Sequence, residues 1–133
     1  MKREELMEMV ERHYFGNVDR YNLEEVLQCF HEDATFTVRS GKPATHQGIA
    51  EIRVMFEELF KGFPKKMVHK DFVHVVDEEK NSIASQFNVE LMSDSDEEVY
   101  QTNCNFFYLE DGKFKEVYVY MMGQNVLGGK KLE

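Results

Sequence analysis

The hydrophobic positions of the chain follow a helical spacing in its first half and an alternating spacing in its second half. Large apolar side chains recur every three or four residues in segments 2–15 and 48–63, and in a shorter segment that begins near Asn22. Asn22 can cap this shorter helix, with Glu25 at the third helical position. Gly16 marks the expected end of the first segment. The first half therefore predicts three helices.

The second half of the chain predicts four long strands. Stretches rich in Val, Ile, Phe and Tyr lie at 67–76, 82–92, 99–109 and 114–122. The breaks between them are short, and the last contains Asp111-Gly112, a strong hairpin signal. Strands joined by such short turns pair as an antiparallel meander, because parallel neighbours need long crossover connections. A brief strand is expected earlier, at 34–39, followed by a turn at 40–43.

The polarity of the strands predicts a sheet that is apolar on both faces at one end. In segment 82–92 one face is apolar, whereas the other carries Gln86, Asn88 and Glu90. In the last two strands this outer face is largely aromatic, with Tyr100, Cys104, Phe106, Tyr108, Tyr118 and Tyr120. The helices can cover only one face, so a second copy of the chain is the expected cover of the other. We expect an α+β fold with helices over a strongly curved sheet, an apolar pocket between them, and a homodimer.

Length and charge narrow the class of protein. The 133 residues suffice for one core, and the net charge of −9 would repel nucleic acids and anionic membranes. The N-terminus lacks the apolar stretch of a signal peptide, and no run approaches the roughly 18 apolar residues of a membrane span. The two cysteines stand outside any CxxC motif and suit a reduced, cytoplasmic protein. We expect a domain over 1–125 and a flexible tail over 126–133 that frays from Gly128-Gly129.

The order of these elements resembles the nuclear-transport-factor-2-like superfamily, which includes SnoaL-like polyketide cyclases, ketosteroid isomerases and scytalone dehydratases. The residues that carry the resemblance are the segment 26–36 (VLQCFHEDATF), His46-Gln47-Gly48 before the third helix, and the late hairpin 109–114 (LEDGKF). The resemblance covers about residues 5–122. It implies a cone-shaped, cystatin-like α+β roll, in which three N-terminal helices pack on a strongly curved mixed or antiparallel sheet around an internal pocket. It also implies a homodimer through the outer face of the sheet.

Compared with the ketosteroid isomerase pattern, Tyr14 falls at the position of the oxyanion-donating tyrosine and Asn105 falls near the second donor. An enolate oxygen in a dry pocket needs such preorganised donors. The general base of that pattern would align with Val38, which cannot transfer a proton, so ketosteroid isomerase activity itself is not expected. The alternative for Tyr14 is that its ring closes the apolar face of the first helix, with the hydroxyl at the rim. Asn103 and Asn105 share one strand face and form a possible ligand-orienting pair, although water could satisfy them.

His69 and Asp71 lie two residues apart on one predicted strand and could form a histidine–carboxylate pair in the pocket. The alternative is that Phe72 faces inward, which would leave both of them in solvent. His74 lies five residues from His69, so on a strand the two rings are expected to point to opposite faces and cannot bind one metal ion. No cofactor-binding fingerprint is present, and neither a metal nor a cofactor is expected.

The pocket is expected to bind a small apolar ligand with a polar group, along a wall of Val18, Met55, Phe56, Phe87, Val89, Asn103, Val117, Val119 and Met121. Two functions remain open. The chain could be a cofactor-independent isomerase, cyclase or dehydratase that acts on a small apolar carbonyl compound. It could equally be a non-catalytic ligand-binding or interaction module of the same fold.

Overall fold

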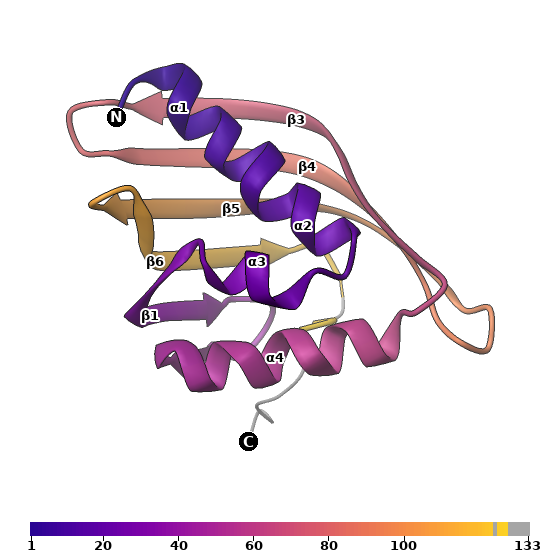
Figure 1. The fold of residues 1–133 in the computed structure, drawn as a ribbon. Coiled ribbons are helices and arrows are strands. Elements are labelled where there is room, and N and C mark those ends of the chain that lie inside the picture. The colour runs from indigo at the N-terminus through magenta and orange to yellow at the C-terminus, as the bar shows by residue number, and fades with distance from the viewer. Residues whose placement is uncertain (124, 128–133) are drawn as a thin grey trace.

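The computed structural model describes residues 1–123 and 125–127 of the chain. Its strands form one six-stranded sheet in the order β2-β1-β6-β5-β4-β3, and the helices lie over one face of that sheet (Figure 1). The strands are β1 (Phe30–Val38), β2 (Ala44–Gln47), β3 (Lys66–Asp77), β4 (Ser82–Met92), β5 (Glu98–Glu110) and β6 (Lys113–Met121). The helical elements are α1 (Arg3–Glu8), η1 (Met9–Phe15), α2 (Gly16–Asp19), α3 (Leu23–Leu27) and α4 (Gly48–Gly62). The α+β class predicted from the sequence is confirmed.

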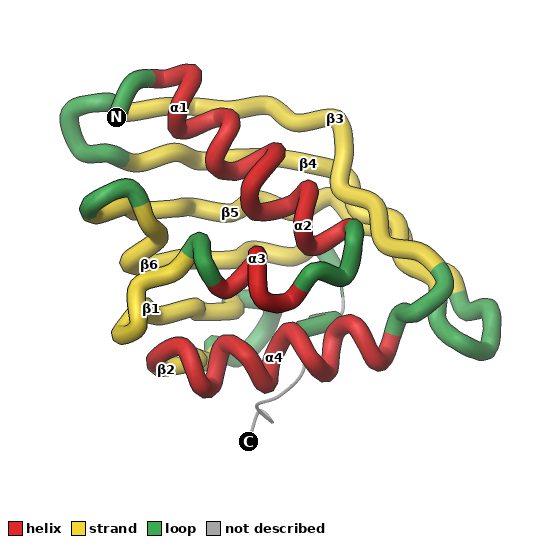
Figure 2. The backbone as a smooth tube through the Cα atoms, in the orientation of Figure 1, coloured by secondary structure: helices red, strands yellow, loops and turns green. Residues whose placement is uncertain are grey.

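The sheet is mixed, with the long strands curving past the helices (Figure 2). Strands β3, β4, β5 and β6 form the predicted antiparallel meander. Strand β1 pairs in parallel with β6 and in antiparallel with the short strand β2, which the sequence did not predict. A parallel pair between strands so far apart in the chain leaves no local turn signal. Strand β1 also begins at Phe30, earlier than the expected residue 34.

The first helical segment continues beyond its expected end. Gly16 does not stop it, because the backbone goes on through α2 to Asp19. The part before Gly16, η1, is a π-helix, a wider turn that often occurs near functional sites. Asn22 lies at the N-cap of α3, as predicted, although its side chain makes no capping hydrogen bond. Because the helical segment continues to Asp19, this residue lies next to β3.

A bulge in β3 changes which side chains face the helices. The pairing of β3 with β4 shifts register between Lys70 and Val73, and Asp71 has a left-handed backbone with φ of 59°. His69 and Phe72 both pack against Phe15, so both face the helical layer. His74, stacked on Phe72, faces the same way. The expected opposition of the two histidines was therefore wrong, because the extra residue in the bulge resets the alternation.

Aromatic side chains fill the space between the sheet and the helices. The largest fully buried side chains include Phe36, Phe56, Phe107 and Phe114. Tyr14 makes edge-to-face contacts with Phe56, Phe107 and Phe114, which come from one helix and two strands. The core is thus continuous from α4 to β5.

The opposite face of the sheet is partly aromatic and uncovered in the single chain. Phe106 and Tyr120 meet edge to face at 5.7 Å between ring centroids, and Tyr108 and Tyr118 do so at 6.0 Å. Phe106, Tyr108 and Tyr120 are each about two-fifths exposed. The guanidinium of Arg39 lies 5.2 Å from the centroid of the Tyr118 ring. We call this set of five side chains the aromatic patch.

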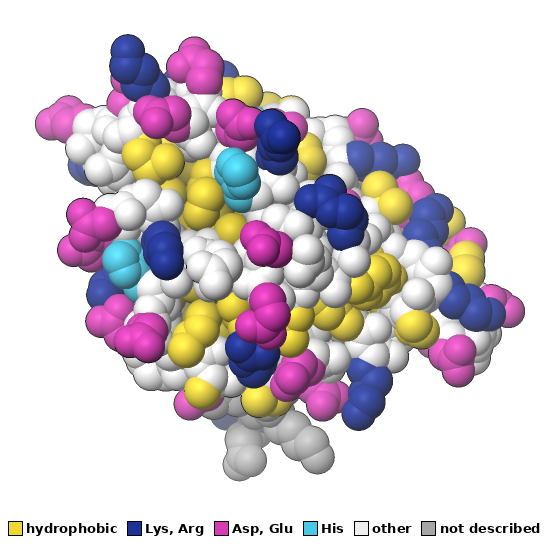
Figure 3. All heavy atoms as spheres, in the orientation of Figure 1, with side chains coloured by type: hydrophobic (Ala, Val, Ile, Leu, Met, Phe, Trp, Pro, Cys, Tyr) yellow, Lys and Arg dark blue, Asp and Glu magenta, His cyan; other side chains and the backbone are white. Residues whose placement is uncertain are grey.

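The helical face of the molecule differs from the aromatic patch. Acidic and basic side chains are interspersed over it, with hydrophobic side chains visible between them (Figure 3). No helix among the described residues is long and apolar enough to cross a membrane.

The bulge gives a first prediction about stability. Replacing Asp71 with Val should lower the free energy of unfolding by about 1–3 kcal/mol, because a β-branched residue is strained at positive φ. Replacing Asp71 with Gly should change it by much less, since Gly adopts this conformation without strain. Urea denaturation measures both. Asn88→Ala, which removes the 3.0 Å hydrogen bond donated to Asp71 by Asn88, is the control for that contact. Equal losses in the Val and Gly variants would show that the backbone conformation does not matter.

Candidate functional site

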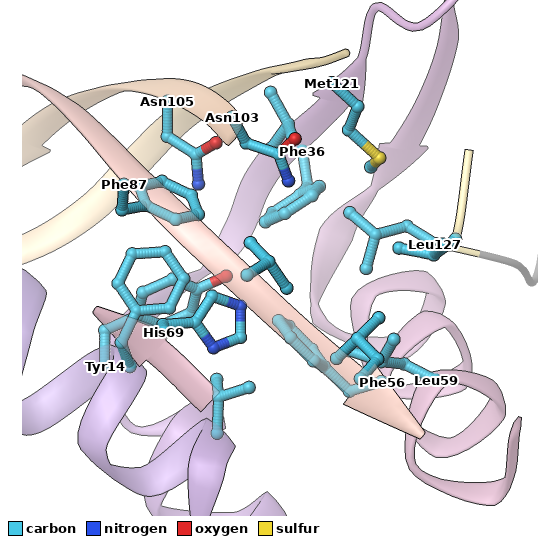
Figure 4. Close-up of a pocket in the computed structure, with 16 residues that line it drawn as sticks. Tyr14, Phe36, Phe56, Leu59, His69, Phe87, Asn103, Asn105, Met121 and Leu127 are labelled. Atoms are coloured by element: carbon cyan, nitrogen blue, oxygen red, sulfur yellow. The ribbon is translucent and has the colours of Figure 1, made fainter. Parts of the chain in front are cut away.

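A cavity of about 40 Å³ lies between the helices and the inner face of the sheet (Figure 4). Most of its wall is apolar, and its polar side chains are Tyr14, His69, Asn103 and Asn105. Among the residues that the structure describes, no Lys, Arg, Asp or Glu side chain lines it. A wall of this kind favours a neutral ligand with one polar end.

The end of α2 holds His69 through one carboxylate. Asp19 Oδ2 accepts a hydrogen bond from the His69 backbone N–H at 2.9 Å, and Asp19 Oδ1 lies 2.6 Å from His69 Nδ1. A carboxylate can only accept, so Nδ1 carries the proton and Nε2 of the neutral ring is a hydrogen-bond acceptor. No atom of the described residues hydrogen-bonds to Nε2. The His69 side chain is 9% exposed and stacks on Phe15 at 4.4 Å between ring centroids. These contacts fix both the tautomer and the orientation of the ring.

Asp71 does not take the place that the sequence assigned to it beside His69. It lies outside the cavity, exposed, where it accepts a hydrogen bond from Asn88. The bulge that turns Asp71 outward keeps His69 inward. The carboxylate partner of His69 is instead Asp19, fifty residues away in sequence. An acidic residue near the end of a helix gives no signal of its own, so sequence reasoning missed Asp19.

Asn103 and Asn105 extend from neighbouring inward positions of β5 into the cavity, opposite Tyr14 and His69 (Figure 4). They are 6% and 2% exposed, and neither side-chain oxygen has a hydrogen-bond partner among the described residues. Buried amides normally find partners, because an unsatisfied polar group costs about 1–3 kcal/mol. Because the unpartnered atoms are oxygens, which accept hydrogen bonds, two such amides side by side favour a hydrogen-bond donor in the cavity, either a ligand hydroxyl or bound water.

Tyr14 reaches the cavity from η1, and its ring is 2% exposed. Burial, and to a smaller degree the nearby Cys29, raises the pKa of the Tyr14 phenol well above its usual value of 10.0. Burial also raises the pKa of the Cys29 thiol, to about 12. Both groups stay protonated at neutral pH. Tyr14 can therefore donate a hydrogen bond but cannot serve as a base.

A second buried histidine, His74, is placed differently from His69. Its Nε2 lies 2.6 Å from Glu11 Oε2 and its Nδ1 lies 2.8 Å from the hydroxyl oxygen of Ser85. Both ring nitrogens are therefore engaged, and His74 does not line the cavity. These contacts of His74 link η1 to the sheet. His69 is the histidine with a nitrogen left for a ligand.

The predicted wall agrees with the cavity at most positions. The apolar side chains expected there that do line it are Val18, Phe56, Phe87, Val89, Val119 and Met121. Met55 and Val117 are fully buried in the core but do not line the cavity. Lining residues that the sequence did not single out are Phe15, Phe36, Leu59, Leu91, Val126 and Leu127.

Two of these missed residues, Val126 and Leu127, fall in the segment expected to be a flexible tail. In the structure they lie against the cavity. The expected start of fraying, Gly128-Gly129, lies outside the described residues. Among the described residues, no three His, Cys, Asp or Glu side chains gather as a possible metal site.

The sequence model of the SnoaL-like domain matches residues 10–117 of the chain. No curated protein sequence matches it. Solved structures share the fold. AusH from Aspergillus nidulans superposes with a TM-score of 0.79 and 17% identity, covering 98% of this chain and 93% of AusH. A candidate isomerase from Bacillus subtilis superposes with a TM-score of 0.77 and 14% sequence identity. The match covers 90% of this chain and 87% of the isomerase chain.

A candidate polyketide cyclase from Xanthomonas campestris pv. campestris gives a TM-score of 0.75 and 16% identity, covering 89% of this chain and 90% of its own. At such identities these likenesses show the fold alone, and the site must be argued from this chain's own residues.

The pKa of Tyr14 gives a prediction about its ionisation. In the native protein, Tyr14→Phe should leave the alkaline absorbance titration unchanged through the range in which exposed tyrosines ionise, because burial raises the pKa of Tyr14 well above its usual value of 10.0. In concentrated urea the same substitution should remove one of the 6 titrating tyrosines. A lost phenolate signal near pH 10 in the native variant would mean that Tyr14 is not shielded from solvent.

Proposed function

Because the chain belongs to the SnoaL-like domain family, we propose that it is a cofactor-independent isomerase or cyclase that transfers a proton on a small, largely apolar carbonyl compound. The observation that carries the proposal is the Asp19–His69 pair, which leaves a free imidazole nitrogen on a histidine that lines an otherwise apolar cavity. The candidate cyclase and isomerase among the similar folds support it. Two free cysteines support a cytoplasmic location.

In the proposed reaction His69 is the general base. Its Nε2 removes a proton from the carbon next to the carbonyl, and the electrons of the broken C–H bond move toward oxygen to give an enolate. Asp19 stabilises the imidazolium that forms. Amide N–H groups of Asn103 and Asn105 and the hydroxyl of Tyr14 can donate hydrogen bonds to the enolate oxygen.

The enolate then leads to one of two products. Where the substrate has a double bond between its β and γ carbons, the enolate is a dienolate, and return of the proton from His69 to the γ carbon gives the conjugated isomer. Attack of the enolate carbon on a second carbonyl of the same molecule closes a ring, and the proton from His69 neutralises the new alkoxide. Both routes balance in atoms and electrons without an oxidant or a reductant.

The size of the cavity restricts the substrate. A volume of about 40 Å³ holds only a few water molecules, whereas pockets for drug-sized ligands measure about 300–1,000 Å³. A steroid skeleton does not fit. Val38, which aligns with the base of the ketosteroid isomerase pattern, is 1% exposed and does not line the cavity. Both facts favour a compact substrate over a steroid.

We also propose that two copies of the chain associate through the aromatic patch. The patch contains large rings, which lose contact with water on association. Arg39 and Glu116 both line the same hollow, so it holds one positive and one negative side chain. A hollow with one cation and one anion can meet its own copy about a two-fold axis without net repulsion. This matters for a chain with a formal charge of −9.

The proposed base gives a prediction about proton exchange. In D₂O, the protein should catalyse deuterium incorporation next to the carbonyl of small neutral ketones, such as cyclopentanone, as followed by NMR. His69→Gln should lower this rate about 10²–10⁴-fold, because Gln cannot accept the proton. Asp19→Asn should also lower it strongly, because an amide facing Nδ1 can stabilise the wrong tautomer.

The matched control is His13→Gln, a histidine on the exposed side of η1. It should leave the exchange rate unchanged. If the wild-type protein binds ketones but does not accelerate exchange, the chain is a binding module rather than an enzyme. If His69→Gln exchanges as fast as the wild type, another group is the base.

The proposed dimer gives a separate prediction. Sedimentation should show a dimer at micromolar concentration, and the double substitution of Tyr108 and Tyr118 with Lys should shift it to monomer, because four charges would meet across the interface. Replacing exposed Val54 on α4 with Lys is the control and should leave the dimer intact. A monomeric wild-type protein would refute the association.

A further inference from the structure

The apolar end of the cavity is filled by the chain's own C-terminal side. Leu127 lies with Met121 and Leu59 at the end of the cavity away from Tyr14, and Phe56 lies beside them (Figure 4). Leu127 is 8% exposed, and Val126 also lines the cavity. Tyr14, His69 and Asn105 stand toward the other end, whereas Asn103 lies between the two ends because it pairs directly with Met121 across β5 and β6. The cavity therefore has a polar end open to a ligand and an aliphatic end already occupied by leucine.

Few interactions besides side-chain burial hold Leu127 in place. Residues 125–127 form no strand, and the Leu127 N–H donates to the Asn125 side chain, 2.8 Å away, within the same segment. Among the described residues, no hydrogen bond joins 125–127 to another element. Before this segment, the carbonyl of Gly123 accepts a hydrogen bond from the Ser40 hydroxyl at 2.7 Å. Gly123 has φ of 112°, a conformation that favours glycine, and there the chain turns away from β6.

A side chain held in this way resembles a ligand more than a core residue. Leucine in the middle of a helix or strand is fixed by the backbone hydrogen bonds on both sides. Within the part of the chain that the structure describes, Leu127 is held mainly by the contacts of its isobutyl group, which a ligand's alkyl chain can also make. The remaining free volume of about 40 Å³ is what Leu127 leaves to a ligand.

We propose that Leu127 determines substrate length, by occupying the subsite for the aliphatic end of a neutral carbonyl compound whose oxygen is held at Asn103 and Asn105. This assignment deepens the proposed function and rests on its placement of the carbonyl group. The described part of the wall holds no Lys or Arg, which favours a neutral head, and Leu59, Met121 and Leu127 favour an alkyl tail. The tail of the substrate lies along Leu127, and the size of residue 127 sets how many carbons fit.

The experiment compares methyl ketones of increasing chain length, from butanone to nonanone, by titration calorimetry or ligand-observed NMR. With wild-type protein, affinity should rise about fourfold per added methylene and then level off once the aliphatic end is full. Leu127→Ala removes three carbons from that end. It should move the plateau to ketones about three carbons longer while leaving the shortest ketones almost unchanged. Leu127→Phe should move it to shorter ketones.

Val75→Ala is the control, because Val75 is an exposed aliphatic residue outside the cavity. It should leave the plateau where it is in the wild type. The paired Ala and Phe variants guard against a general loss of stability, since a loosened fold would not shift the plateau in opposite directions. The same plateau in all variants would overturn the proposal, and so would the absence of ketone binding to every one of them.

The result is distinguishable from a failure of the proposed reaction. His69→Gln removes the base but leaves the aliphatic end intact, so it should keep the wild-type chain-length profile. A shifted profile in the Leu127 variants without any deuterium exchange would preserve the subsite and reject the enzyme. Exchange that is catalysed with no dependence on residue 127 would preserve the enzyme and reject the subsite.

Discussion

The site depends on one carboxylate that joins the last helical turn of the N-terminal segment to the strand beneath it. Asp19 binds both the backbone and the ring of His69, so the helix end and the histidine cannot move independently. Glu11 and His74 form a second link of the same kind, two helical turns earlier. Both links need their histidines on one face of β3, and the bulge around Asp71 provides that. Tyr14 lies on the π-helix between these two carboxylates in sequence, so the segment that carries it into the cavity is held on both sides.

The chemistry then follows from what surrounds the free imidazole nitrogen. The described part of the wall is mostly apolar and holds no Lys, Arg, Asp or Glu side chain, so electrostatic interactions inside the cavity are stronger than in water. Neutral donors suit such a place, since amides and a phenol keep their protons at neutral pH and need no counter-ion. The raised pKa of Tyr14 is one expression of this environment. In the proposed reaction, the donors would offset the charge that develops on the substrate oxygen, which is what lets a weak base act on a carbon acid.

Sequence patterns predicted the elements far better than they predicted the partners within the site. Helical spacing in 48–63 and alternation in the four long strands depend on local burial, and both reappear in the structure. The pairing of β1 with β6 and of Asp19 with His69 depends on contacts between distant segments, for which no local pattern exists. Asp71 was assigned to the wrong face because side chains were assumed to alternate regularly along β3, and the bulge interrupts that alternation. The position of Leu127 was missed because a polar, glycine-containing terminus is typical of a flexible tail. In the structure its two adjacent aliphatic residues, Val126 and Leu127, line the cavity.

The fold does not determine which strand carries the general base. In this chain the proposed base lies on a different strand from the base of the ketosteroid isomerase pattern. At the position that aligns with the base of the ketosteroid isomerase pattern, Val38 is packed into the core and can take no part in proton transfer. The candidate base lies on β3 instead, at the far edge of the sheet from β1. Both strands curve around the same cavity, so a base on either one can approach a ligand held at β5. The feature that both arrangements need is a largely apolar cavity with hydrogen-bond donors on one wall. Moving the base across that space changes which face of the ligand loses its proton, and therefore which products the same frame can form.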